Sequence, residues 1–154
     1  LWVLFDIGPM VEQLFTSSKY TVLYLIAGVI GYIASLVWTP LGVSIGASGA
    51  IMGLIGVLIG ASFHLGSAGK AMRSQLWKWV IYIAIFGLLP MFSVDNAAHF
   101  GGVVSGIILG YLVPTGEPAT RGSELLWNGL AVIAVVVIAG SFALMALSLS
   151  RPLG

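Results

Sequence analysis

Long apolar stretches without charged residues alternate with short polar segments along most of the chain. Each stretch approaches or exceeds the roughly 17–25 residues that a helix needs to cross a bilayer. None shows the period-two alternation of apolar and polar positions that a membrane barrel requires. The pattern therefore predicts five membrane-spanning helices, at residues 20–38, 45–65, 79–94, 96–116 and 125–150.

Two segments depart from the simplest form of this pattern. The third stretch is the shortest and contains Leu89 followed by Pro90, so we expect that helix to stop or bend near the proline. The first ten residues, LWVLFDIGPM, are too short to span a bilayer and lack the charged start of a signal peptide. We expect them to be the last turns of a helix that begins upstream, which makes the chain part of a longer protein.

The composition agrees with a membrane protein. Hydrophobic residues make up 59% of the 154 residues and charged residues only 7%, with a mean hydropathy of +1.10. A soluble domain would carry about 25% charged residues. The chain has no cysteine, which excludes a disulfide framework, a thiol nucleophile and a cysteine-ligated metal. The net charge of +1 and the absence of a basic patch give no reason to expect a nucleic-acid partner.

The few charges predict the orientation of the helices in the membrane. Lys70, Arg73 and Lys78 lie between the second and third stretches, in what we expect to be a loop, and the positive-inside tendency places that loop in the cytoplasm. Alternation then predicts the side of each remaining connection. Inside are the turn with Glu12 and Lys19 and the linker 114–124; outside are the 39–44 connection and Asp95.

Two polar residues are predicted to lie at one depth in the membrane. Ser48 and His99 each follow the outer end of a predicted helix by about one turn, which is roughly 5–8 Å at 1.5 Å per residue. A serine and a histidine at the same depth can come within hydrogen-bond reach, as a nucleophile and its base must.

Small residues support a direct contact between these two helices. Three glycines follow one another at spacings of three and four residues around Ser48, and a second set forms two successive GxxxG steps after His99. Such faces allow helix backbones to approach closely in a bilayer. The glycines are Gly46, Gly49 and Gly53 in the first helix, and Gly102, Gly106 and Gly110 in the second.

Structural roles compete with functional ones at each polar position. Spacing alone favours a structural Ser48, since a serine in a membrane helix commonly bonds back to a carbonyl one turn earlier. An ionisable group at membrane depth is functional by default, which favours a functional His99. We interpret His64 as a solvated residue at the inner interface. Asp95 is interpreted as a helix N-terminal charge and not as a catalytic partner.

Two motifs resemble those of the rhomboid intramembrane serine proteases. GASGAIMG, which contains Ser48, resembles the GxSG nucleophile motif of that family, and VDNAAHFGGVVSG, which contains His99, is similar to its histidine helix. FDIGPMVEQLF resembles the end of its second core helix. The resemblance covers residues 1–113, and it implies an all-α, polytopic transmembrane bundle. That bundle would be a partial six-helix core (1–113), followed by a cytoplasmic linker (114–124) and an additional C-terminal membrane helix (125–150).

The resemblance implies a catalytic dyad that works without a metal or an organic cofactor. Ser48 would attack a peptide carbonyl in a transmembrane segment of a substrate protein, and His99 would serve as the general base. The backbone N–H of Ser48 would support the oxyanion, and Gly46 and Gly49 would leave room for the substrate backbone. Lipid bilayer and transmembrane proteins are then the partners, and the plasma membrane of a bacterium is the expected location.

Two departures from the family pattern stand out. The family's second core helix carries a histidine and an asparagine that help form the oxyanion hole, and the alignment puts them upstream of Leu1. Together with the missing first core helix, this predicts that the 154 residues alone are inactive or unfolded. Many bacterial members also have an aromatic residue one turn after the serine, against which the histidine stacks. Here that position is Met52, whose thioether can contact an imidazole face.

Two other functions compete with the protease. A catalytically inactive rhomboid-like protein that binds transmembrane helices would share the fold, but such proteins commonly lose one member of the dyad, and both are present here. A transporter fragment with His99 as a proton relay would show paired broken helices and further intramembrane charges, neither of which the sequence contains.

Overall fold

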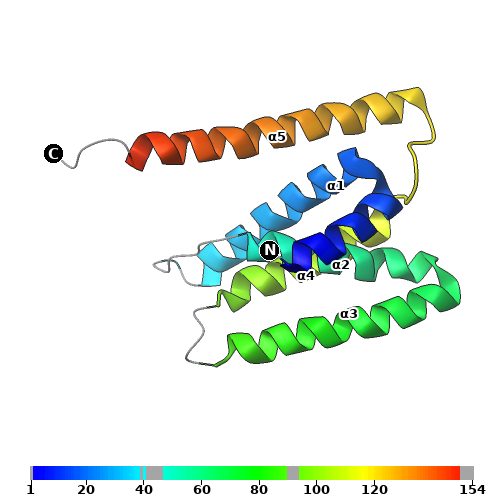
Figure 1. The fold of residues 1–154 in the computed structure, drawn as a ribbon, viewed down its shortest axis with the longest axis horizontal. Helices are drawn as coiled ribbons and strands as arrows, with labels where there is room; N and C mark the ends of the chain where they lie inside the picture. The colour runs from blue at the N-terminus through cyan, green and yellow to red at the C-terminus, as the bar shows by residue number, and fades with distance from the viewer. Residues whose placement is uncertain (1, 39, 41–46, 90–93, 150–154) are drawn as a thin grey trace.

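The computed structural model describes residues 2–38, 40, 47–89 and 94–149 of the chain. Within these residues every secondary-structure element is a helix, which confirms the predicted all-α bundle (Figure 1). The elements are α1 (Trp2–Trp38), α2 (Ser48–Ala61), the short 3-10 helix η1 (Ser62–His64), α3 (Gly66–Gly87), α4 (Asn96–Leu112) and α5 (Arg121–Leu149).

Helix α1 consists of two arms that meet at Thr16. The backbone of Thr16 has φ 72° and ψ 157°, which is outside the helical region and breaks the hydrogen-bonded ladder. Figure 1 shows the two arms folding back on each other. A methyl group at Gly8, in the first arm, would lie 3.5 Å from the hydroxyl oxygen of Tyr20 in the second. The first ten residues are helical from Trp2 onward, as predicted for the end of a helix.

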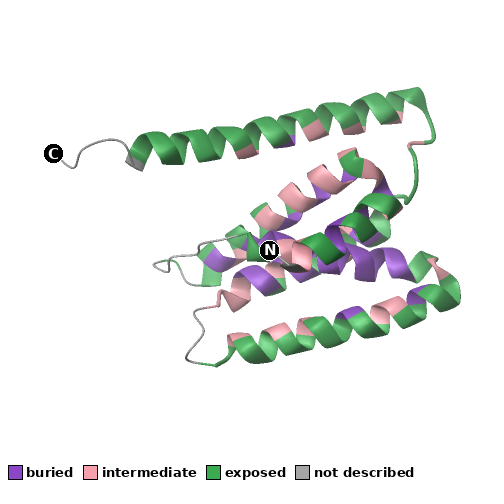
Figure 2. Ribbon diagram, in the orientation of Figure 1, coloured by how far each residue is buried: buried purple, intermediate pink, exposed green. Residues whose placement is uncertain are grey.

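Helix α2 lies at the centre of the bundle. Every residue from Met52 to Ala61 is buried, and Figure 2 shows the buried positions concentrated on this helix and on the faces turned toward it. A helix that is apolar on all sides can be stable only when other helices surround it. In this chain α1, α3 and α4 provide that cover.

The contact between α2 and α4 is made of glycines and backbone. A methyl group at Gly106 would overlap the carbonyl oxygen of Gly53, and one at Gly110 would overlap that of Val57. On the other side of the contact, a methyl group at Gly56 would overlap the carbonyl oxygen of Val103. The two backbones therefore touch over three helical turns, an approach that any larger residue would prevent.

The outer helices expose most of their apolar side chains. Two described segments are long and apolar enough to cross a membrane: Val3–Trp38 in α1, and Arg121–Ser148 in α5, whose most apolar window is only 6% buried within the protein. The apolar segments Ser48–His64 and Asn96–Leu112 are shorter. An exposed apolar helix such as α5 is the surface expected of a protein surrounded by lipid.

The segment with the three inner cations was predicted as a loop, and that prediction is wrong. Lys70, Arg73 and Lys78 lie within α3, which begins at Gly66 and ends at Gly87. Gly66 has a φ of +57°, which lets the chain turn out of η1 directly into the new helix. Lysine, arginine, methionine and glutamine are good helix formers, so the helix extends through this polar stretch. The end of α3 before Pro90 agrees with the prediction.

The connection to the last helix is also shorter than the linker predicted for 114–124. Helix α5 begins at Arg121 and not at residue 125, because the hydroxyl of Thr120 accepts the N–H of Ser123 and caps the helix. Lys19 is only 2% exposed, and its ammonium group donates to the carbonyl oxygens of Pro114 at 2.8 Å and Gly116 at 2.7 Å. The start of the linker is therefore held against the bend of α1.

We predict that Gly106→Ala destabilises the bundle by about 1–3 kcal/mol, because the added methyl group forces α2 and α4 apart. Thermal unfolding in detergent, followed by circular dichroism, measures the change. Gly129→Ala is the matched control, since a methyl group there meets nothing within 4 Å. Equal unfolding midpoints for the two variants would contradict the prediction.

We predict that Lys19→Met releases the linker. The two carbonyl oxygens lose a charged donor, and hydrogen bonds of this kind contribute about 1.5–3 kcal/mol. Limited trypsin digestion should then cut faster after Arg121, which lies just beyond the linker. Lys70→Met, which removes an exposed cation, should leave that rate unchanged. An unchanged rate in Lys19→Met would show that the ammonium group does not hold the linker.

Candidate active site

Ser48 is the first residue of α2, and its side chain is exposed. The helix ladder begins with the N–H of Ile51, which donates to the carbonyl oxygen of Ala47 at 3.0 Å. The backbone N–H groups of Ser48, Gly49 and Ala50 therefore point out of the start of the helix without a partner in the ladder. This end of α2 combines an accessible hydroxyl with backbone donors and the positive end of a helix dipole. Gly46 lies outside the described residues.

His99 lies one turn inside α4, behind a helix cap. The Asp95 carboxylate accepts the N–H of Ala98 at 2.9 Å and the hydroxyl of Ser35 in α1, which anchors the start of α4 to its neighbour. This bears out the interpretation of Asp95 as an N-terminal helix charge. The side chain of His99 is only 9% exposed, and neither ring nitrogen has a hydrogen-bond partner within the described part of the chain.

The two residues flank one of the tightest contacts between their helices. A methyl group at Gly49 would lie 3.3 Å from the carbonyl oxygen of Ala98, and one at Gly102 would overlap the carbonyl oxygen of Gly49. Ser48 precedes Gly49 and His99 follows Ala98. The structure therefore brings the backbones beside Ser48 and His99 into contact at the end of the α2–α4 pair where both helices begin.

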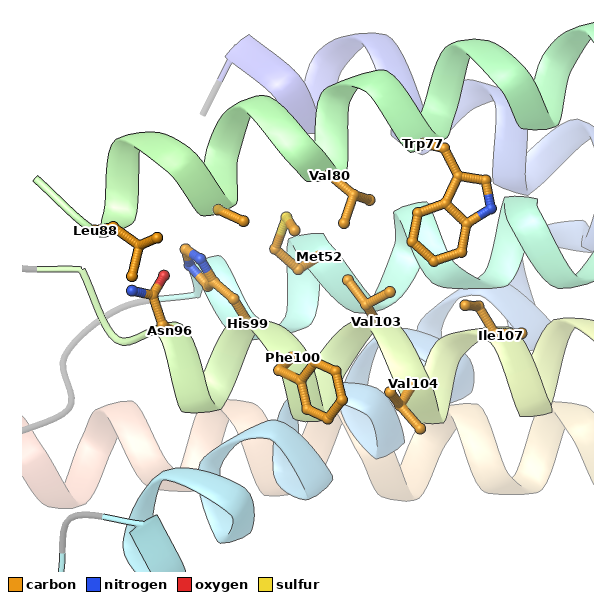
Figure 3. Close-up of a pocket in the computed structure, with 11 residues that line it drawn as sticks. Met52, Trp77, Val80, Leu88, Asn96, His99, Phe100, Val103, Val104 and Ile107 are labelled. Carbon is orange, nitrogen blue, oxygen red and sulfur yellow. The ribbon is translucent and has the colours of Figure 1, made fainter.

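The side chains of Ser48 and His99 line separate cavities. Ser48 faces a cavity of about 300 Å³ between α2 and the second arm of α1, which includes Tyr24 and Tyr32. His99 faces a second cavity of about 300 Å³ between α4 and α3 (Figure 3). Among the described residues no hydrogen bond joins the Ser48 hydroxyl to the His99 ring, so the structure brings their neighbouring residues together but does not pair the two side chains.

Met52 lines the cavity that His99 faces. It is one turn after Ser48 on α2 and only 4% exposed. Figure 3 shows its side chain directed toward the space between α3 and α4, beside the His99 ring. Gly53, the next residue, packs against the second arm of α1, where a methyl group would overlap the side chain of Ala27.

Asn96 is a polar residue of this cavity that reasoning from the sequence missed. Its amide nitrogen donates to the carbonyl oxygen of Gly87 at 2.8 Å, which ties the start of α4 to the end of α3. Its amide oxygen is buried without a partner among the described residues. The signal available in the sequence was its position three residues before His99, which places both side chains on one face of a helix.

His64 lies at the far end of the bundle from these residues. Its exposed ring stacks on Tyr111 with 4.9 Å between ring centres, and its Nε2 lies 3.0 Å from the carbonyl oxygen of Tyr111. It takes no part in either cavity, in keeping with its interpretation as a boundary residue.

Comparison with known proteins assigns this arrangement to a family. A family model described as the Rhomboid domain matches residues 1–115. The chain is 35% identical over 116 residues to "RHOMBOID-like protein 6, mitochondrial" of Arabidopsis thaliana, covering 71% of this chain and 37% of that protein. It is 31% identical over 137 residues to "Rhomboid protease GluP" of Bacillus subtilis, covering 87% of this chain and 26% of that protein. The chain thus spans well under half the length of these relatives.

We predict that Met52→Ala destabilises the protein by about 2–5 kcal/mol, the cost of deleting a large buried side chain. It also removes the wall beside His99, so the activity proposed below should fall with the stability. The matched control is Met145→Ala on α5, where the methionine is 53% exposed. Thermal unfolding of the two variants in one detergent makes the comparison, and equal losses would contradict it.

Proposed function

The chain belongs to the rhomboid family, and from this premise we propose that it is an intramembrane serine endopeptidase that uses Ser48 as nucleophile and His99 as general base. Its relative from Bacillus subtilis is named a rhomboid protease. The observation that carries the proposal is the contact between Gly49 and Ala98, because it brings the neighbours of Ser48 and His99 together at one end of two packed helices.

The proposed reaction is acyl transfer to the serine followed by hydrolysis. The Ser48 oxygen forms a bond to the carbonyl carbon of a substrate peptide bond, and His99 takes the hydroxyl proton. His99 then gives that proton to the departing amine as the C–N bond breaks. Water attacks the resulting ester, and the proton it loses returns through His99 to the Ser48 oxygen.

The start of α2 supports the charge that develops in this reaction. The substrate carbonyl oxygen becomes negative in the tetrahedral intermediate, and backbone N–H groups at a helix N-terminus are suited to bind it. The N–H groups of Ser48 and Gly49 meet this requirement, since the α2 ladder does not use them. Because the chain spans only part of its relatives, this activity is proposed for the full-length protein.

The reaction also requires a hydrogen bond that the described residues do not make. The Ser48 hydroxyl must reach a His99 ring nitrogen, and neither nitrogen has a partner among the described residues, so the unprotonated one is available to accept it. Catalytic hydrogen bonds are commonly long or misaligned in a protein without substrate and tighten when the substrate binds. We propose that binding of the substrate brings the two side chains together.

An inactive rhomboid-like protein that binds transmembrane helices is the second candidate. The observation that favours it is the separation of Ser48 and His99 into different cavities. Both functions act on transmembrane proteins in a bilayer, and only the protease needs the two side chains to meet. The proposed location is a bacterial plasma membrane, on the analogy of the Bacillus subtilis relative.

We predict that Ser48→Ala and His99→Ala each lower cleavage of a model transmembrane substrate by at least about 1000-fold, as loss of a nucleophile or its base does in other serine hydrolases. The full-length protein in vesicles is the sample, and gel analysis of the products is the measurement. His64→Ala should cleave at the parent rate, since His64 lies away from both cavities.

Labelling with a serine-reactive fluorophosphonate separates the two candidates. The protease should become labelled, and Ser48→Ala should not. A folded parent protein that cleaves nothing and shows no Ser48-dependent labelling would leave the inactive helix-binding protein as the function.

A further inference from the structure

We propose that Asn96 orients the His99 ring through one bound water molecule, which accepts the ring N–H and donates to the Asn96 amide oxygen. The inference rests on the proposed function of His99 as a general base. It adds a third, positioning residue to the Ser48–His99 pair.

Three buried polar atoms meet in the cavity between α3 and α4 without a partner among the described residues. They are the two ring nitrogens of His99 and the amide oxygen of Asn96. A buried polar atom without a hydrogen bond is costly in a folded protein, so these three atoms favour a bound partner. Figure 3 shows the Asn96 amide and the His99 ring side by side at one end of this cavity.

The orientation of the Asn96 amide is set by the end of α3. Its nitrogen donates to the carbonyl oxygen of Gly87 at 2.8 Å. Because the amide group has only one nitrogen and one oxygen, this bond determines which way each of them points. The oxygen must therefore point away from that carbonyl. A methyl group at residue 87 would overlap the amide oxygen, so glycine at this position is what makes room for it.

The cavity suits a water molecule better than a direct hydrogen bond. No bond joins Asn96 to His99, although the two are one helical turn apart on α4. A water molecule needs roughly 10–15 Å³ of accessible volume and two or more polar partners. The cavity offers about 300 Å³, and its remaining lining is largely apolar, so the two polar side chains determine where a water molecule binds.

Asp95, the nearest carboxylate along the chain, acts on His99 through its charge but is not its hydrogen-bond partner. It accepts the hydroxyl of Ser35 and the N–H of Ala98, and no hydrogen bond joins it to the His99 ring. Within the described residues the amide oxygen of Asn96 is therefore the acceptor best placed to orient the ring through water.

Such a bridge would decide which tautomer of His99 is present. The hydrogen bond made by one ring nitrogen determines which nitrogen carries the proton. A nitrogen that donates to the water leaves the other one free of a proton and able to accept from Ser48. Without the bridge, neutral His99 divides between two tautomers, and only one of them is competent as a base.

Two substitutions at Asn96 distinguish the role of its amide oxygen from the role of its hydrogen bond to Gly87. Both Asn96→Leu and Asn96→Asp remove the N–H that binds Gly87, but only Asn96→Asp keeps an oxygen that can accept from water. We expect Asn96→Leu to lower kcat by about 10- to 100-fold with little change in KM, the loss typical when a partner that orients a functional histidine is removed. Asn96→Asp should recover most of kcat.

Nitrogen-15 NMR of histidine-labelled full-length protein at alkaline pH gives a readout that does not depend on activity. The His99 resonances, assigned with His99→Gln, should report one tautomer in the parent protein and in Asn96→Asp, and a mixture in Asn96→Leu. Asn128→Leu is the control: this other asparagine also bonds between helices, to Ser18, but lies on α5. It should leave both kcat and the His99 resonances unchanged.

The outcomes separate this inference from the proposed function. If Asn96→Asp is as slow as Asn96→Leu, or if Asn96→Leu keeps a single tautomer, the inference is wrong while Ser48-dependent labelling still stands. If Asn96→Leu does not fold, Gly87→Ala replaces it, because the added methyl group displaces the Asn96 oxygen and should give the same mixture of tautomers. Absence of Ser48-dependent labelling in the parent would instead reject the proposed protease.

Discussion

Along the glycines of α2 and α4, two backbones approach so closely that a methyl group at Gly102, Gly106 or Gly110 would overlap an α2 carbonyl oxygen. This contact is stabilised by close packing of complementary surfaces, because apolar side chains gain little by leaving lipid for the protein interior. It makes α2 the enclosed centre of the bundle. It also sets the position of the candidate site, since Ser48 and His99 lie near the starts of these two helices.

Polar contacts act at the two ends of this apolar pair rather than along it. At the start of α4, Asp95 bonds to Ser35 of α1, and Asn96 bonds to Gly87 of α3. At the other end Lys19 binds the two carbonyl oxygens that follow α4. Each contact joins α4 to another element through backbone or side-chain groups that would be costly to leave unpaired in an apolar environment. The glycine contacts set the distance between α2 and α4, and these polar contacts set the position of α4 along its neighbours.

The candidate chemistry depends on the different surroundings of Ser48 and His99. Ser48 is exposed at a helix start, whereas His99 is enclosed between α3 and α4. An enclosed histidine has few partners, so the atoms around it have a large effect on its orientation and tautomer. In this chain those neighbours are Met52 and Asn96. The family of the chain makes Ser48 and His99 the residues of interest, and the fold determines what surrounds them.

The sequence alone determined the helical class, the rhomboid resemblance and the glycines suited to close packing, because hydrophobic length and small-residue spacing are local properties. It also identified Asp95 as a charge at a helix N-terminus. The tertiary structure decided what depends on residues distant in the chain: the burial of Lys19 by carbonyls of residues 114 and 116, and the bond from Asn96 to Gly87. The extension of α3 through Lys70, Arg73 and Lys78 was mispredicted, because charge marks the edge of a membrane span but does not end a helix. The separate cavities of Ser48 and His99 likewise arise from how α1 and α3 pack on either side of the α2–α4 pair, which no local pattern in the chain encodes.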